Sequence, residues 1–207
     1  MPLPNGVDPA GVIHPVCASA GWMGNRGLLH DQDAQIVRAW RLKAWITCRL
    51  SYKGWSRKPL MKPGRYTELF FLDEATALSA GHRPCAMCRR ADYLAFKAQW
   101  LMANAFETDM LAEELDGRLH EERTHRGSSE GWRQPLGMLP SGVMVVSHDV
   151  ACLWNGESLR AWSSTGYGVR CIPDDLRTKV NLLTPPSIVD TIRLGYPVQV
   201  HSSARNP

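Results

Sequence analysis

Cys85 and Cys88 are the closest pair of cysteines in the chain, and their spacing constrains its fold more than any other feature. They lie in a turn behind a predicted short helix, where a Cys-x2-Cys spacing lets two sulfur atoms reach one ion with tetrahedral Zn–S geometry. Six cysteines in 207 residues are too few and too unevenly spaced for a disulfide scaffold. The sequence therefore predicts a structural Zn²⁺ site that uses this pair.

The other ligands of this site must come from distant parts of the chain. A structural zinc ion needs about four ligands, and the sequence contains no second pair of this kind. Cys48 is the predicted third ligand, because alternating apolar and polar residues from 40 to 50 indicate a half-buried strand that points it inward. For the fourth ligand the candidates are His30, His82 and Cys17, and His30 is preferred because ligation by His82, so close to the pair, would strain the turn. The predicted ligand set is Cys85, Cys88, Cys48 and His30.

Two other interpretations of the pair stay open. Cys85 and Cys88 could be ordinary buried thiols behind a helix. They could also form a thiol-redox pair, because Arg89 and Arg90 follow them at a predicted helix start, and such a setting lowers the pKa of a thiol. Titration of free thiols with and without a chelator separates these interpretations from a metal site.

Periodicity and turn residues together predict an α+β fold. The first thirty residues are expected to be loop, strands are expected at residues 40–50, 66–72, 143–146, 150–154, 157–162 and 198–201, and helices at 74–80, 94–105, 108–119 and 184–194. The apolar stripe of the second helix is expected to contain Leu94, Ala98, Leu101, Met102 and Ala105. Residues 1–125 are predicted to form a small zinc-stabilised α/β module with basic strands. Residues 126–207 are predicted to form a β-hairpin-rich part packed on it as one compact unit.

The segment 72–88 carries a resemblance to a known family. Its residues, Leu-Asp-Glu-Ala-Thr-Ala-Leu-Ser-Ala-Gly-His-Arg-Pro-Cys-Ala-Met-Cys, resemble the second half of the zinc-binding domain of Ada-type DNA alkylation-repair proteins. The resemblance implies a four-cysteine zinc site in a small α/β module that contacts DNA phosphates and is sometimes appended to nucleases. In the repair proteins one thiolate of an upstream cysteine pair accepts a methyl group. Cys48 is the single cysteine in that region here, so the resemblance implies the fold of the knuckle rather than methyl transfer. The chain as a whole also resembles bacterial proteins without an assigned activity.

A long basic stretch lies between Asp33 and Glu68, and it contains no acidic residue. Nine lysines and arginines fall inside it, interleaved with tryptophans and tyrosines. Basic side chains neutralise phosphates and exposed aromatic rings stack on unpaired bases, so this composition indicates a nucleic-acid contact surface. A solvated strand face is the alternative interpretation. The predicted contacts, with DNA favoured over RNA, are Lys53, Trp55, Arg57, Lys58, Lys62 and Arg65.

An acidic helix offers a second, enzymatic hypothesis. Glu113, Asp116 and His120 share a helical face at i, i+3 and i+7, and such groups can bind a catalytic metal in a hydrolase or nuclease. A solvated acidic face gives the same pattern. The third hypothesis is a protein-interaction domain, in which the acidic helix and the basic stretch contact partners or a second copy.

The sequence also allows a prediction of where in the cell the protein is found. It starts without a basic segment followed by an apolar one, and no apolar run approaches the ~18 residues of a membrane helix. We therefore expect a soluble, cytoplasmic protein that does not bind membranes.

Overall fold

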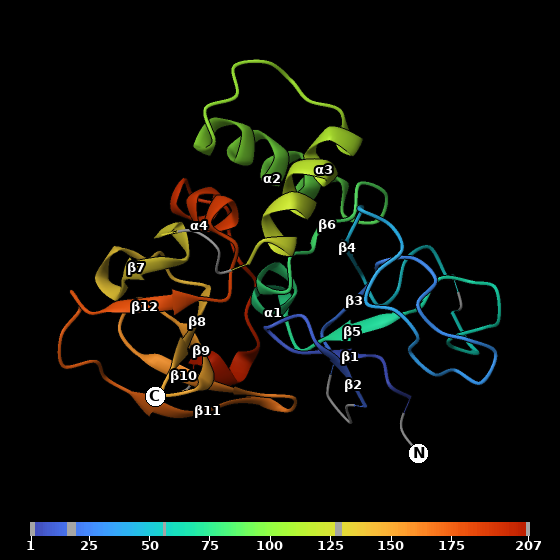
Figure 1. Cartoon of the computed structure of the whole chain (residues 1–207), viewed down its shortest axis with the longest axis horizontal. Coiled ribbons are helices and arrows are strands. Elements are labelled where there is room, and N and C mark those ends of the chain that lie inside the picture. Colours follow the sequence, from blue (N-terminus) through green and yellow to red (C-terminus); the bar gives the residue numbers. More distant parts are fainter. Residues whose placement is uncertain (1–2, 16–19, 56, 127–129, 206–207) are drawn as a thin grey trace.

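The computed structural model describes residues 3–15, 20–55, 57–126 and 130–205 and shows an α+β fold. This confirms the predicted fold class. Two six-stranded sheets lie on either side of a central helix, with two further helices above them (Figure 1). Within the described residues, no helix has the length and apolar character needed to cross a membrane.

The first sheet uses strands from the N-terminal part of the chain, in the order β2-β1-β5-β3-β4-β6. Its strands are β1 (Gly6–Val7), β2 (Ile13–His14), β3 (Trp22–Asn25), β4 (Ile46–Cys48), β5 (Leu69–Phe71) and β6 (Arg83–Pro84). β5 pairs in parallel with β1 and antiparallel with β3, and β4 pairs in parallel with β6. This pairing brings the end of β4 beside the turn that follows β6.

The second sheet is antiparallel and has the order β11-β10-β9-β8-β12-β7. Its strands are β7 (Arg133–Pro135), β8 (Val143–Ser147), β9 (Val150–Trp154), β10 (Leu159–Ser163), β11 (Gly166–Cys171) and β12 (Lys179–Leu182). β9 and β10 form a hairpin whose loop contains Asn155 and Gly156, a dipeptide that favours tight turns between strands. The loop of this hairpin spans residues 155–158, and within it the Asn155 side chain accepts the backbone N–H groups of Glu157 and Ser158.

The helices connect the two sheets. They are α1 (Glu74–Ser79), α2 (Arg90–Ala103), α3 (Ala112–Thr124) and α4 (Pro186–Arg193). α1 contacts both β5 and β8, and α2 packs on α4. The main core contains residues from both parts of the chain, including Phe96 and Trp100 of α2, Val145 of β8 and Ile188 of α4.

Asp73 and Glu74, at the start of α1, hold the C-terminal segment against this helix. Asp73 is buried and caps the helix by accepting the N–H of Thr76 at 2.9 Å, a common role for an aspartate directly before a helix. Its other carboxylate oxygen accepts the hydroxyl of Tyr167 at 2.8 Å and the N–H of His201 at 2.9 Å. One capping carboxylate therefore also fixes two distant parts of the chain.

Glu74 carries a fully buried charge that is matched by Arg89. Its carboxylate accepts hydrogen bonds from Arg89 Nη2, the Tyr196 hydroxyl at 2.8 Å and the Gln199 N–H at 3.0 Å. Burial opposes the charge of Arg89, but the Glu74 carboxylate raises its pKa overall. The Arg89 guanidinium also lies 4.0 Å from the centre of the Trp22 ring in β3. This pair thus connects α1, α2, the first sheet and the C-terminal segment.

Several predicted elements differ from those in the structure. The 40–50 strand is reduced to β4, and Trp40 and Leu42 are exposed rather than inward-facing. Residues 198–201 form no strand, and three short strands occur in the first thirty residues, where loop was expected. The second helix is present but buries the opposite face to the one predicted, through Tyr93, Phe96 and Trp100 rather than through residues such as Leu94 and Met102. Three aromatic rings offer more apolar area to the core than the aliphatic stripe.

Replacing Glu74 with alanine would leave Arg89 buried without its carboxylate partner. We expect Glu74→Ala to lower the free energy of unfolding by about 3–5 kcal/mol, because an uncompensated buried charge is costly. Chemical denaturation measures this loss. Asp190→Ala is the control, since it breaks the exposed Asp190–Arg193 pair, and we expect it to cost less than about 1 kcal/mol. Equal, small effects of the two substitutions would contradict the structural importance given to Glu74.

Candidate metal centre and basic loop

Three cysteines from two elements of the first sheet converge. Cys48 ends β4, while Cys85 and Cys88 lie in the turn between β6 and α2. The N–H of Cys85 donates to the carbonyl of Thr47 at 2.9 Å, which holds this turn against the end of β4. The three sulfur atoms lie within 4.8 Å of one another, and all three residues are buried. They could therefore hold a metal ion.

The backbone around these sulfur atoms favours thiolate. The N–H of Arg49 points to Cys88 Sγ and that of Met87 to Cys85 Sγ, each at 3.4 Å. A hydrogen bond from Cys48 lowers the pKa of Cys85 to about 5, against the opposing effect of burial. The same bond raises the pKa of Cys48, and burial raises that of Cys88. A bound cation would replace the shared protons, because metals are ligated by thiolates rather than thiols.

Three apolar side chains and one tyrosine enclose the cysteine group. Met23 of β3 is buried against it, and Ile46, Tyr52 and Phe70 pack on it. Such an apolar wall limits solvent access to a metal site and strengthens the interaction between the ion and its thiolates.

The histidines considered as ligands lie elsewhere. His30 is buried outside the cysteine group, with Nδ1 at 2.6 Å from Thr67 Oγ1 and Nε2 at 3.2 Å from the Lys62 carbonyl oxygen. Both ring nitrogens are therefore occupied in holding the chain near Lys62. His82 is also buried, and its Nε2 accepts a hydrogen bond from Arg26 at 3.2 Å. Cys17 lies outside the described residues.

The basic loop, defined here as residues 53–55 and 57–66, surrounds an open hollow of about 440 Å³. The hollow is lined by Trp55, Arg57, Lys62, Arg65, Tyr66 and Glu68. Four of the six predicted nucleic-acid contacts therefore share one site, and Lys53 and Lys58 are exposed on the same loop. Trp55 and Tyr66 are 58% and 40% exposed. Exposure of this extent is unusual, because tryptophan is highly buried on average and tyrosine is intermediate.

Tyr66 and Glu68 line this hollow without being among the predicted contacts, and of the two Glu68 is the acidic residue. It is the first carboxylate after the basic stretch and is 5% exposed. Its Oε2 accepts the N–H of Met61 at 2.8 Å, which closes the loop. In the sequence, Glu68 is marked only by its position as the single acidic residue that ends the basic stretch.

The basic loop is connected to the cysteine group through short contacts. Arg49, next to Cys48, donates its N–H to Cys88, and Arg57 donates to the carbonyl of Leu50. Tyr52 packs on the cysteines, and its ring centre lies 5.8 Å from that of Trp55 in an edge-to-face arrangement. A metal ion at the cysteines would therefore also fix one side of the basic loop.

The proposed hydrolase residues do not form a site in this structure. Both oxygens of Asp116 are paired with Arg83 at 2.7 Å, whereas Glu113 is exposed. His120 is buried and accepts a hydrogen bond from Arg123 Nε at 3.3 Å, and burial followed by the charge of Arg123 lowers its pKa. In the part of the chain that the structure describes, the three cysteines form the one group of possible metal ligands.

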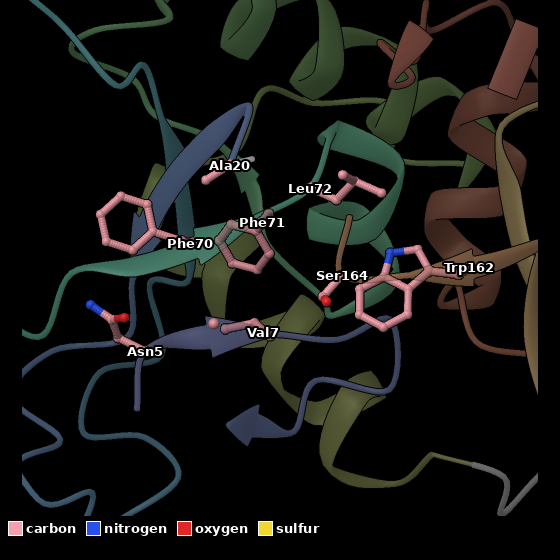
Figure 2. A pocket seen from close by; sticks show the side chains of 9 residues that line it. Asn5, Val7, Ala20, Phe70, Phe71, Leu72, Trp162 and Ser164 are labelled. Carbon is pink, nitrogen blue, oxygen red and sulfur yellow. The ribbon is translucent and has the colours of Figure 1, made fainter. Parts of the chain in front are cut away.

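A second hollow of about 230 Å³ lies where β1 and β5 approach the β10–β11 hairpin (Figure 2). Its lining is mainly apolar and includes Val7, Phe71, Leu72 and Trp162. The Trp162 indole N–H donates to Thr76 Oγ1 at 3.1 Å, which fixes the ring at this position. The hollow lies at the seam between the two sheets and contains none of the predicted site residues.

No protein-family model matches the chain, and no curated protein or solved structure matches it. The assignment of a function therefore depends on the cysteine group and the basic loop themselves.

We expect the protein, purified without added metal, to contain about one metal ion per chain, bound by the three-cysteine group. Cys48→Ser should lose the ion and the stability that it supplies, since the binding energy of a structural metal is folding energy. Elemental analysis and thermal unfolding measure the two effects. Cys171→Ser, at an exposed cysteine, is the matched control and should change neither.

The variant His30→Gln tests whether His30 is a metal ligand or serves only in the hydrogen bonds that the structure shows. Because His30 hydrogen-bonds to Thr67 and Lys62, we expect this variant to keep its metal and to lose thermal stability. Loss of the ion from His30→Gln would instead make His30 the fourth ligand. A stable, metal-free wild-type protein would favour thiol chemistry at Cys85 and Cys88.

Proposed function

We propose that the protein binds nucleic acid through the basic loop and that a structural zinc ion at Cys48, Cys85 and Cys88 supports this surface. The observation that carries the proposal is the hollow in which cations and exposed aromatic rings meet. Arg57, Lys62 and Arg65 can neutralise phosphates, and the rings of Trp55 and Tyr66 can stack on unpaired bases.

Zinc is the metal that best suits a buried group of thiolates. Soft sulfur ligands favour zinc over hard cations such as Mg²⁺ and Ca²⁺, which prefer oxygen. Three cysteines leave about one further position in a tetrahedral site. In a structural role the ion would act through the segment 48–52, which connects the cysteine group to the basic loop.

The resemblance of residues 72–88 to the Ada-type zinc-binding domain supports the same proposal. The resemblance implies a zinc knuckle that contacts DNA phosphates, and it favours DNA over RNA as the partner. The end of β4 supplies Cys48 beside the Cys85–Cys88 turn, so the chain assembles its cysteine group from an upstream and a downstream element.

Salt dependence distinguishes the phosphate contacts from the stacking contacts. We expect Trp55→Ala to weaken binding of a single-stranded oligonucleotide by about 1–3 kcal/mol without changing the dependence on salt. The double variant Lys62→Ala/Arg65→Ala should make the slope of log affinity against log salt less negative by about 1.4. Fluorescence anisotropy over a range of salt concentrations measures both quantities.

The control for this experiment is Arg177→Ala/Lys179→Ala, which removes two exposed cations beside or within the second sheet. It should leave both affinity and salt slope unchanged. If the folded loop variants bind as tightly as wild type, the basic loop is not the binding surface. If wild type binds no nucleic acid at low salt, a protein-interaction role for the loop becomes the better explanation.

A further inference from the structure

Glu68 places a carboxylate in the hollow of the basic loop, where a phosphate-binding surface has no evident need for one. Glu68 is buried, with 5% of its surface exposed, and it lines the hollow together with Trp55 and Tyr66. A negative charge at this position repels phosphate. The cations around the hollow and the carboxylate therefore act on different parts of a ligand.

The carboxylate of Glu68 also has unused hydrogen-bonding capacity. Oε2 accepts the Met61 N–H, whereas among the residues that the structure describes no donor reaches Oε1. Within the same residues no lysine, arginine or histidine lies within ion-pair distance of Glu68. An ionised carboxylate accepts hydrogen bonds at about four positions, so a ligand in the hollow can meet several of them.

We propose that the hollow binds one unpaired guanine and that Glu68 reads its Watson–Crick edge. This inference rests on the proposed nucleic-acid binding. Guanine presents two adjacent donors, N1–H and the 2-amino group, which match an acceptor that cannot donate. Thymine and uracil present one N–H between two carbonyl oxygens, and these oxygens are repelled by the carboxylate.

The surrounding residues support this arrangement. Trp55 and Tyr66 supply aromatic surface for the faces of the base, which is how sequence-specific recognition of single strands usually works. Arg57, Lys62 and Arg65 line the same hollow, so they can contact phosphates of a strand bound there. Glu68 is itself held by the Met61 N–H, so the acceptor is oriented before a ligand arrives.

The test compares two nine-nucleotide strands, one of thymine alone and one with a single central guanine. We expect wild type to bind the guanine strand about tenfold more tightly. Glu68→Gln should reduce this preference to about threefold or less, because the neutral amide loses the acceptor that matches guanine and no longer repels the carbonyl oxygens of thymine. The glutamine carbonyl can still accept the Met61 N–H, and thermal unfolding checks that the variant is folded.

A second measurement needs no variant. The central guanine is replaced by 1-methylguanine, which lacks the N1–H donor, and the strand is offered to the wild-type protein. We expect it to bind no more tightly than the thymine strand. Equal binding of the guanine, 1-methylguanine and thymine strands would overturn the role of Glu68 and leave the phosphate and stacking contacts standing. Absence of binding to all three strands would overturn the proposed function as well.

Discussion

The buried Glu74–Arg89 pair is the interaction on which the rest of the structure depends. Glu74 begins the helix between the two sheets, and Arg89 precedes α2 and lies directly after the Cys85–Cys88 turn. Two buried charges are costly to remove from water, so they are stable only while each satisfies the other and the remaining hydrogen bonds are made. Tyr196 and Gln199 donate the remaining hydrogen bonds to Glu74, and Arg89 Nε donates to Asp92, whereas Arg89 Nη1 has no hydrogen-bond partner among the described residues. The position of the cysteine turn is therefore tied to the packing of the C-terminal segment.

The candidate site could be predicted from sequence where its signal is local. The spacing of Cys85 and Cys88 is a property of one turn. Cys48 is buried as predicted, but Trp45 and Thr47 are buried as well, so the predicted alternation does not hold around β4. The role of His30 could not be predicted, because its partners Thr67 and Lys62 are more than thirty residues away and a histidine suits metal and hydrogen-bonding roles equally.

The elements of the fold could likewise be predicted where they depend on neighbouring residues. The cap at Asp73 and the β9–β10 hairpin follow from local rules of capping and turn formation, and both occur. The strands of the first thirty residues are two to four residues long and are stabilised by pairing with distant segments, so they leave no periodic pattern. The aliphatic spacing in α2 predicts the wrong buried face, because the larger rings of Tyr93, Phe96 and Trp100 pack into the core from the other side of the helix.

The segment around β5 explains how one short strand can serve both candidate sites. Glu68 lies directly before β5, and Phe70 is the middle residue of this strand. Phe70 packs on the cysteine group, and Glu68 lines the hollow of the basic loop. Leu69 and Phe71 point to the other face and enter the apolar core beside α1. The core thus fixes the strand, and the strand fixes the position of the cysteine group relative to the hollow.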